Sequence, residues 1–151
     1  MPAVEVVPSY TLPRLIMQRL IDFDSDPLKL ILCPYNAAIN NLKLVYADVS
    51  AYELTTGAGY TAGGKSLDFV TVEELDDRVL VRSPPLIWTG LTKTFEIAIL
   101  YANVTRGGIS DPLIQIYHLN PAGGYADLTT TGQDWLFAFP NNQTILRFER
   151  G

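Results

Sequence analysis

Short apolar segments separated by turn residues constrain the fold of this chain more than any other sequence feature. Several of them alternate apolar with polar or small side chains at period two, the spacing of a strand that buries one face. They are rich in aromatic and β-branched residues, which favour strands. We expect strands within residues 28–33, 42–47, 67–72, 79–82, 95–101, 113–119, 135–139 and 146–149.

Clusters of glycine, proline and asparagine separate these segments and predict the turns between them. The clearest clusters span residues 105–108, 120–124 and 140–142. No internal repeat and no linker is visible, so the chain is treated as one domain. Seven or eight short strands with this spacing predict a mainly β fold, a single antiparallel β-sandwich or barrel.

The first 23 residues do not follow the β pattern. Proline stiffens residues 1–12, so we expect an extended N-terminal arm there and a β-sandwich or barrel domain over residues 13–151. At most one or two short helices are expected, the first of them opened by Pro13. The residues that suit this helix are Leu15, Ile16, Arg19 and Leu20.

We expect the arm to leave its own domain and to lie on a neighbouring subunit. Its apolar residues are too few to form a core, and its prolines reduce the entropy that is lost on docking. The alternative is that the arm packs on its own domain as an edge strand. The candidate partner contacts are Val4, Val6, Val7 and Pro8.

Charge argues against nucleic acid and membrane as partners. The 151 residues carry a net charge of −5, and the basic residues are scattered. Charged residues make up 18% of the chain, below the usual quarter, which points weakly to a surface covered by a partner. We expect no signal peptide and no membrane span. The single cysteine, Cys33, lies in an apolar segment and predicts a buried thiol in a protein that folds in a reducing cytosol.

Residues 59–66, Gly-Tyr-Thr-Ala-Gly-Gly-Lys-Ser, match the Walker A pattern of nucleotide-binding proteins. Phosphate binding by such a loop requires a buried strand before it and a helix after it. Residues 51–56 are half polar, and residues 67–72 alternate as a strand does. We therefore interpret the segment as a glycine-rich loop that needs positive φ angles. A small nucleotide-binding protein is kept as the alternative from another functional class.

The remaining candidate groups do not form a site. His118 has no Cys, Asp or Glu at metal-ligand spacing, so a core or interface histidine is expected. The acidic residues 73–77 lack the spacing of a calcium loop and predict a solvated turn. Nothing places a serine and a carboxylate beside His118. We therefore expect no catalytic residues, no cofactor and no metal.

Residues 47–67 resemble a family of small structural proteins of tailed bacteriophages. The similar pattern is Asp-Val-Ser, then Glu-(Leu/Val), then Gly-x-Gly-Tyr-Thr-x-Gly-Gly. Residues 26–32 are similar to an early strand of the family, and Trp88 and residues 97–101 to later positions. The resemblance covers roughly residues 15–102 and is strongest around the glycine loop. It implies a virion protein and does not imply a position in the particle.

These observations lead to a functional expectation. The chain is expected to be a non-enzymatic bacteriophage virion protein, assembled in the host cytoplasm, that forms a homo-oligomer and binds other virion proteins. The leading hypothesis is a capsid decoration, or cement, protein that stabilises the head by binding the major capsid protein. The alternative within the virion is an adaptor of the neck or tail, or a fibre-attachment protein.

Overall fold

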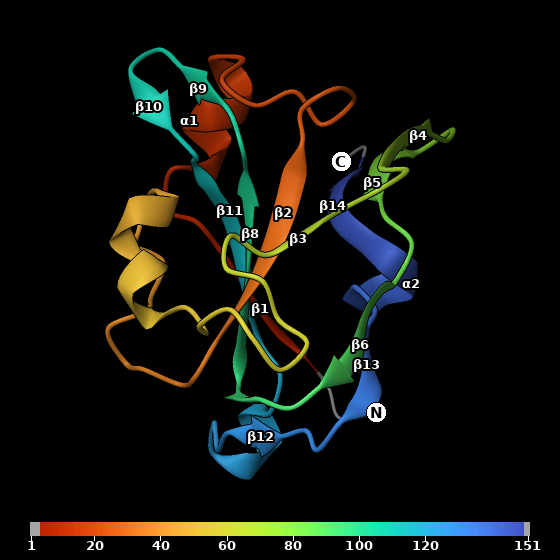
Figure 1. Cartoon of the computed structure of the whole chain (residues 1–151). Coiled ribbons are helices and arrows are strands. Elements are labelled where there is room, and N and C mark those ends of the chain that lie inside the picture. Colours follow the sequence, from red (N-terminus) through yellow and green to blue (C-terminus); the bar gives the residue numbers. More distant parts are fainter. Residues whose placement is uncertain (1–3, 150–151) are drawn as a thin grey trace.

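The computed structural model describes residues 4–149 and is mainly β. Strands account for 42% and helices for 13% of the chain, which confirms the predicted fold class. The central element is a five-stranded antiparallel sheet (Figure 1). Its strands, in spatial order, are β1 (Glu5–Pro8), β11 (Leu113–His118), β8 (Ile97–Ala102), β2 (Leu28–Cys33) and β3 (Lys65–Ser66).

A long ribbon packs against one face of this sheet (Figure 1). One of its strands runs through β5 and β6 and the other through β13 and β14, because β5 pairs with β14 and β6 pairs with β13. A further strand, β4, pairs with β5 and forms a hairpin with it. The bounds are β4 (Thr71–Glu74), β5 (Arg78–Arg82), β6 (Leu86–Leu91), β13 (Gln133–Phe137) and β14 (Thr144–Glu149).

Short elements complete the fold. Two strand pairs are formed by β7 (Thr94–Phe95) with β12 (Leu128–Thr129) and by β9 (Thr105–Arg106) with β10 (Ile109–Ser110). The described residues contain two short helical segments, α1 (Leu12–Met17) and α2 (Pro140–Gln143), and in α2 the φ angles of Asn141 and Asn142 are left-handed, at 56° and 61°. Three turns of 3-10 helix span Tyr46–Asp48, Ser50–Tyr52 and Pro121–Gly123.

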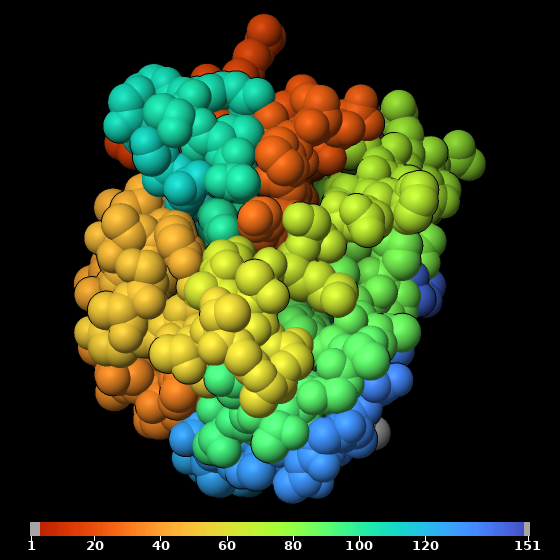
Figure 2. All heavy atoms as spheres, in the orientation of Figure 1, coloured from red at the N-terminus to blue at the C-terminus, as the bar shows by residue number. Residues whose placement is uncertain are grey.

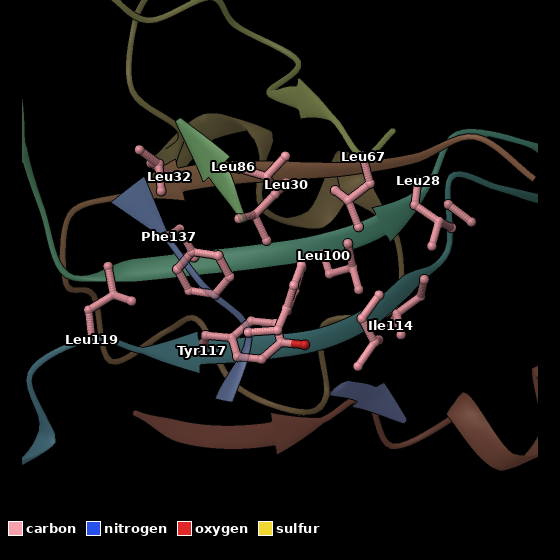
Figure 3. Packing of buried hydrophobic residues seen from close by; sticks show 14 of the residues in the cluster. Leu28, Leu30, Leu32, Leu67, Leu86, Leu100, Ile114, Tyr117, Leu119 and Phe137 are labelled. Atoms are coloured by element: carbon pink, nitrogen blue, oxygen red, sulfur yellow. The ribbon is translucent and has the colours of Figure 1, made fainter. Parts of the chain in front are cut away.

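Both faces of the central sheet are buried. All six residues of β8 are buried, so consecutive side chains enter two separate apolar clusters. The first cluster lies between the sheet and the ribbon and contains Leu30, Leu100 and Phe137 (Figure 3). The second lies between the sheet and residues 34–52 and contains Ile31 and Ile99. An antiparallel sheet usually keeps one face in water, so this sheet needs a cover on each side.

The ribbon keeps the alternation that is typical of half-buried strands. In β6, Leu86 and Trp88 are buried while Ile87 between them is exposed. In β13, Phe137 is buried while its neighbour Leu136 is exposed. The ribbon therefore covers the first cluster with one face and leaves the other face open to solvent.

Two predicted strands are wrong. Residues 42–47 form no strand, and Leu42 is 66% exposed, because Asp48 accepts hydrogen bonds from the backbone N–H groups of Leu44 and Val45 and favours a turn. Residues 67–72 are interrupted at Phe69, whose φ of 61° is incompatible with a strand. The strand at β2 has the predicted bounds, and the turn predicted at 105–108 joins β9 and β10.

The expectation of an arm that leaves its domain is corrected for the described residues. β1 pairs with β11 along its whole length, so the edge-strand alternative applies. Val4 and Val6 pack against the first cluster and Val7 against the second, and only Pro8 of the candidate partner contacts is exposed. The physical reason is that alternating valines gain more by covering both clusters than by lying in solvent. The expected boundary after residue 12 falls inside α1, whose Leu12 is buried.

Deletion of residues 2–8 should destabilise the isolated chain. The deletion removes a four-residue strand pairing and the burial of three valines, and we expect a loss of about 2–4 kcal/mol of unfolding free energy. This corresponds to a melting temperature lower by roughly 5–15 °C, measured by circular dichroism without any partner. Tyr10→Ala, a change at a 71% exposed side chain, is the control. An unchanged melting temperature after the deletion would restore the free arm.

Candidate functional site

The glycine-rich loop, residues 57–64, lies over the edge of the central sheet that β3 forms. Figure 2 shows this yellow segment on the front of the molecule, over the central strands of Figure 1. Four of its glycines have positive φ, between 87° and 127°, as predicted. The loop is thus built from the backbone conformations that glycine alone adopts readily.

Two of these glycines are required by close packing as well as by φ. A Cβ atom on Gly64 would lie 2.3 Å from the carbonyl oxygen of Leu30 in β2. A Cβ atom on Gly59 would lie 2.8 Å from the carbonyl oxygen of Gly90 in β6. The loop therefore contacts the backbone of the sheet on one side and of the ribbon on the other, and it joins the two layers.

The Glu53 carboxylate anchors the loop. It accepts hydrogen bonds from the hydroxyl of Tyr60 at 2.6 Å, from the backbone N–H of Gly63 at 2.8 Å, and from the hydroxyl of Tyr46. The carbonyl oxygen of Gly63 in turn accepts a hydrogen bond from the hydroxyl of Tyr101 in β8, at 2.7 Å. These bonds occupy the polar groups that the loop places against the sheet, as buried polar groups require.

The anchor leaves the Walker-like motif in a different geometry from a nucleotide site. Lys65 and Ser66 form strand β3, which pairs with β2 where a P-loop would begin its helix. The Nζ atom of Lys65 lies 5.7 Å from the centre of the Trp88 ring, a cation–π contact. The lysine and serine that complete the Walker A pattern therefore belong to a paired strand.

His118 pairs with a buried carboxylate. Its Nδ1 atom lies 2.9 Å from Oε2 of Glu96, whose side chain is fully buried and also accepts the backbone N–H of Asn120. The rings of Tyr35 and Tyr125 pack against the imidazole. Sequence reasoning expected a core or interface histidine but missed Glu96, since only the pairing of β8 with β11 brings the two together. The arrangement links the ends of these strands.

The structure separates the other groups considered in the sequence. The acidic residues 73–77 lie in β4 and in its turn to β5, and this hairpin projects from the molecule, as the solvated turn predicts (Figure 1). Cys33 is fully buried in β2, as predicted, and burial raises the pKa of its thiol. Among residues 4–149, no three His, Cys, Asp or Glu side chains gather as metal ligands.

The outer face of the ribbon carries a pair of exposed apolar side chains that the sequence did not single out. Ile87 of β6 and Leu136 of β13 lie directly opposite each other and are 47% and 48% exposed. Pro85 lines a hollow with Ile87, and Ala138 directly follows β13; both side chains are half-buried. We call these four residues the ribbon face. The β-favouring residues Leu86, Ile87 and Trp88 could have predicted strand β6, but Pro84 and Pro85 directly before them indicated a break in the chain.

Gly64→Ala and Gly63→Ala form a matched pair that tests the loop packing. Both glycines have positive φ, but a Cβ atom on Gly63 would meet nothing within 4 Å. We expect Gly63→Ala to lower the unfolding free energy by about 1–2 kcal/mol, from backbone strain alone. Gly64→Ala should cost at least about 2 kcal/mol more, because it also forces the loop off β2. Equal losses in chemical denaturation would contradict the packing of Gly64 on Leu30.

Alkaline pH should weaken the fold through Tyr60 of the loop and Tyr101, which donates a hydrogen bond to it. Burial, and then the hydrogen bond to Glu53, raise the pKa of Tyr60 above its usual range, and burial raises the pKa of Tyr101 to about 12. A raised folded-state pKa stabilises the fold fully below the unfolded value of about 10, and this stabilisation is lost as pH rises through the folded value. We expect the unfolding free energy to fall between about pH 10 and 12.

The measurement is tyrosine absorbance against pH for the native chain and for the chain in denaturant. In the native chain, the exposed tyrosines should ionise near pH 10, and the rest of the absorbance change should appear only when the chain unfolds. The denatured chain should titrate in one step near pH 10. Identical titration curves would contradict the buried anchor.

Comparisons with protein-family models, with curated proteins and with solved structures found no match. Within the described part of the chain, none of the helices has the length and apolar character to cross a membrane. The resemblance of residues 47–67 to tailed-phage structural proteins therefore stays a prediction.

Proposed function

We propose that this chain is a non-enzymatic structural protein of a tailed-bacteriophage particle, most simply a decoration protein that binds the major capsid protein on the head. The ribbon face carries this proposal. It places Ile87 and Leu136 opposite each other on a two-stranded scaffold, and exposed apolar patches mark protein contacts. The resemblance around the glycine loop adds the virion as the setting, with assembly in the host cytoplasm.

The side chains that could take part in catalysis or ligand binding have structural roles in this proposal. Glu53 is occupied by two tyrosine hydroxyls and a backbone N–H, and Glu96 is occupied by His118 and a backbone N–H. Lys65 and Ser66 belong to a strand. These side chains hold segments of the fold together, and we assign the particle partner to the open ribbon face.

The same surface serves a second position in the particle. A neck or tail adaptor, or a fibre-attachment protein, would use the ribbon face for a different virion partner. Copy number separates the positions, since decoration of a whole shell requires hundreds of copies, whereas a neck or tail ring requires about six or twelve. Homo-oligomers are expected in both cases.

Ile87→Lys combined with Leu136→Glu should abolish incorporation into particles. Opposite charges face each other in this variant, so the ribbon itself should pair normally. We expect the variant to fold, by circular dichroism, and its copy number per particle to fall at least about tenfold, because charges replace the apolar contact. The copy number is measured by mass spectrometry of purified particles, relative to the major capsid protein. Leu42→Lys, at a 66% exposed side chain elsewhere, is the control.

Two results would contradict the proposal. Wild-type chain absent from purified particles would remove the virion role. Micromolar binding of ATP with Mg²⁺, abolished by Lys65→Ala, would favour the nucleotide-binding alternative instead.

A further inference from the structure

Phe69 is the most exposed large apolar side chain of the described residues, at 84%. Its φ of 61° lies in the left-handed region, which a phenylalanine rarely adopts. Both ends of its loop are fixed, by the buried Leu67 on one side and by strand β4 on the other. A strained backbone that holds an aromatic ring in solvent is a feature that the fold itself does not need, and such outliers gather at contact sites.

An open apolar cleft of about 780 Å³ lies between the segment that follows α1 and the inner face of strands β4, β5 and β14. We call it the end cleft. Its volume exceeds that of an aromatic side chain, and its lining is mostly aliphatic or aromatic. The apolar residues that line it include Ile21, Phe23, Val72, Val79, Val81 and Phe148.

Phe69 and the end cleft lie on opposite faces of the same small sheet. Thr71 pairs with Arg82, and both line a shallow hollow with Phe69. The next pair, Val72 with Val81, lines the end cleft. Successive side chains of a strand point to opposite faces, so Phe69 cannot enter the cleft of its own chain.

The charges around the two features are complementary. Asp68 precedes Phe69 and is exposed, and the exposed Arg19 lies at the rim of the cleft. Lys65 and Arg82 each line a hollow with Phe69, and Arg106, Asp22 and Asp24 line the cleft together with Arg19. Both surfaces thus carry acidic and basic groups. This pattern favours a second copy of the chain over a partner of uniform charge.

We propose that copies of this chain associate head to tail, with Phe69 of one copy inserted into the end cleft of the next. The contact joins two different surfaces, so it is heterologous and produces a closed ring or an open filament. The inference deepens the homo-oligomer of the proposed function. Phe69 shares a hollow with Pro85 and Ile87 of the ribbon face, whereas the end cleft contains no residue of that face, so the cleft variants separate self-association from particle binding. A chain that stays monomeric but is incorporated into particles would overturn this inference and leave the proposed function standing.

Two variants that each remove one half of the contact provide the test. Phe69→Ser removes the ring, and Val72→Arg blocks the cleft at a side chain that is 44% exposed and tolerant of change. Phe148→Arg, at a 48% exposed side chain on the other wall, is a second cleft variant in case the first one unfolds. Leu42→Ser is the matched control for loss of an exposed apolar side chain.

Sedimentation velocity over a range of concentrations gives the oligomeric state of each chain. We expect the wild type and Leu42→Ser to form oligomers, and each contact variant alone to weaken self-association at least about tenfold. A mixture of Phe69→Ser with Val72→Arg should form a heterodimer that grows no further, because only one ring and one open cleft remain intact.

Three results would overturn the proposal. The first is a wild-type chain that stays monomeric at the highest concentration. The second is a Phe69→Ser variant that self-associates like the wild type. The third is a mixture of the two variants that does not form the heterodimer, which would indicate symmetric packing or a different partner for Phe69.

Discussion

Strand β8 imposes the main constraint on this structure, because its side chains are apolar on both faces. All six of its residues are buried, and the neighbouring strands β2 and β11 are nearly as apolar. Such a sheet can be stable only if both faces are removed from water. The ribbon covers one face with regular strands, and residues 34–52 cover the other with turns and short 3-10 helices. The rest of the fold provides these two covers.

The irregular cover depends on one carboxylate. A strand satisfies its backbone groups through its neighbours, but a looped segment packed against a sheet needs side chains for this purpose. Glu53 serves it by accepting hydrogen bonds from Tyr46, Tyr60 and the backbone of Gly63. The carboxylate of Glu53, the hydroxyl of Tyr60 and the glycines of the loop therefore form one structural unit, which accounts for their spacing.

The sequence predicted those parts of the fold that depend on local pattern. The bounds of β2 are correct because its apolar run ends at Pro34, and the positive φ angles of the loop follow from its glycines. Contacts between distant segments were not predictable. The apolar residues Leu42 and Leu44 suggested a strand. The hydrogen bond from the Leu44 backbone to Asp48, which favours a turn instead, could not be seen in the apolar pattern. The pairing of His118 with Glu96, and the exposure of Ile87 beside Leu136, depend on strand partners that composition does not specify.

The burial of Cys33 has a consequence for measuring how this molecule moves. The thiol has no exposed surface, it lies at the end of β2 beside β8, and burial raises its pKa so that the reactive thiolate is suppressed. A thiol reagent can reach it only when residues 34–52 separate from the sheet or the sheet itself opens. As the chain has a single cysteine, its labelling rate reports the opening of one known position, with no engineered probe. Strand β2 thus contains its own reporter for the opening of the second cluster.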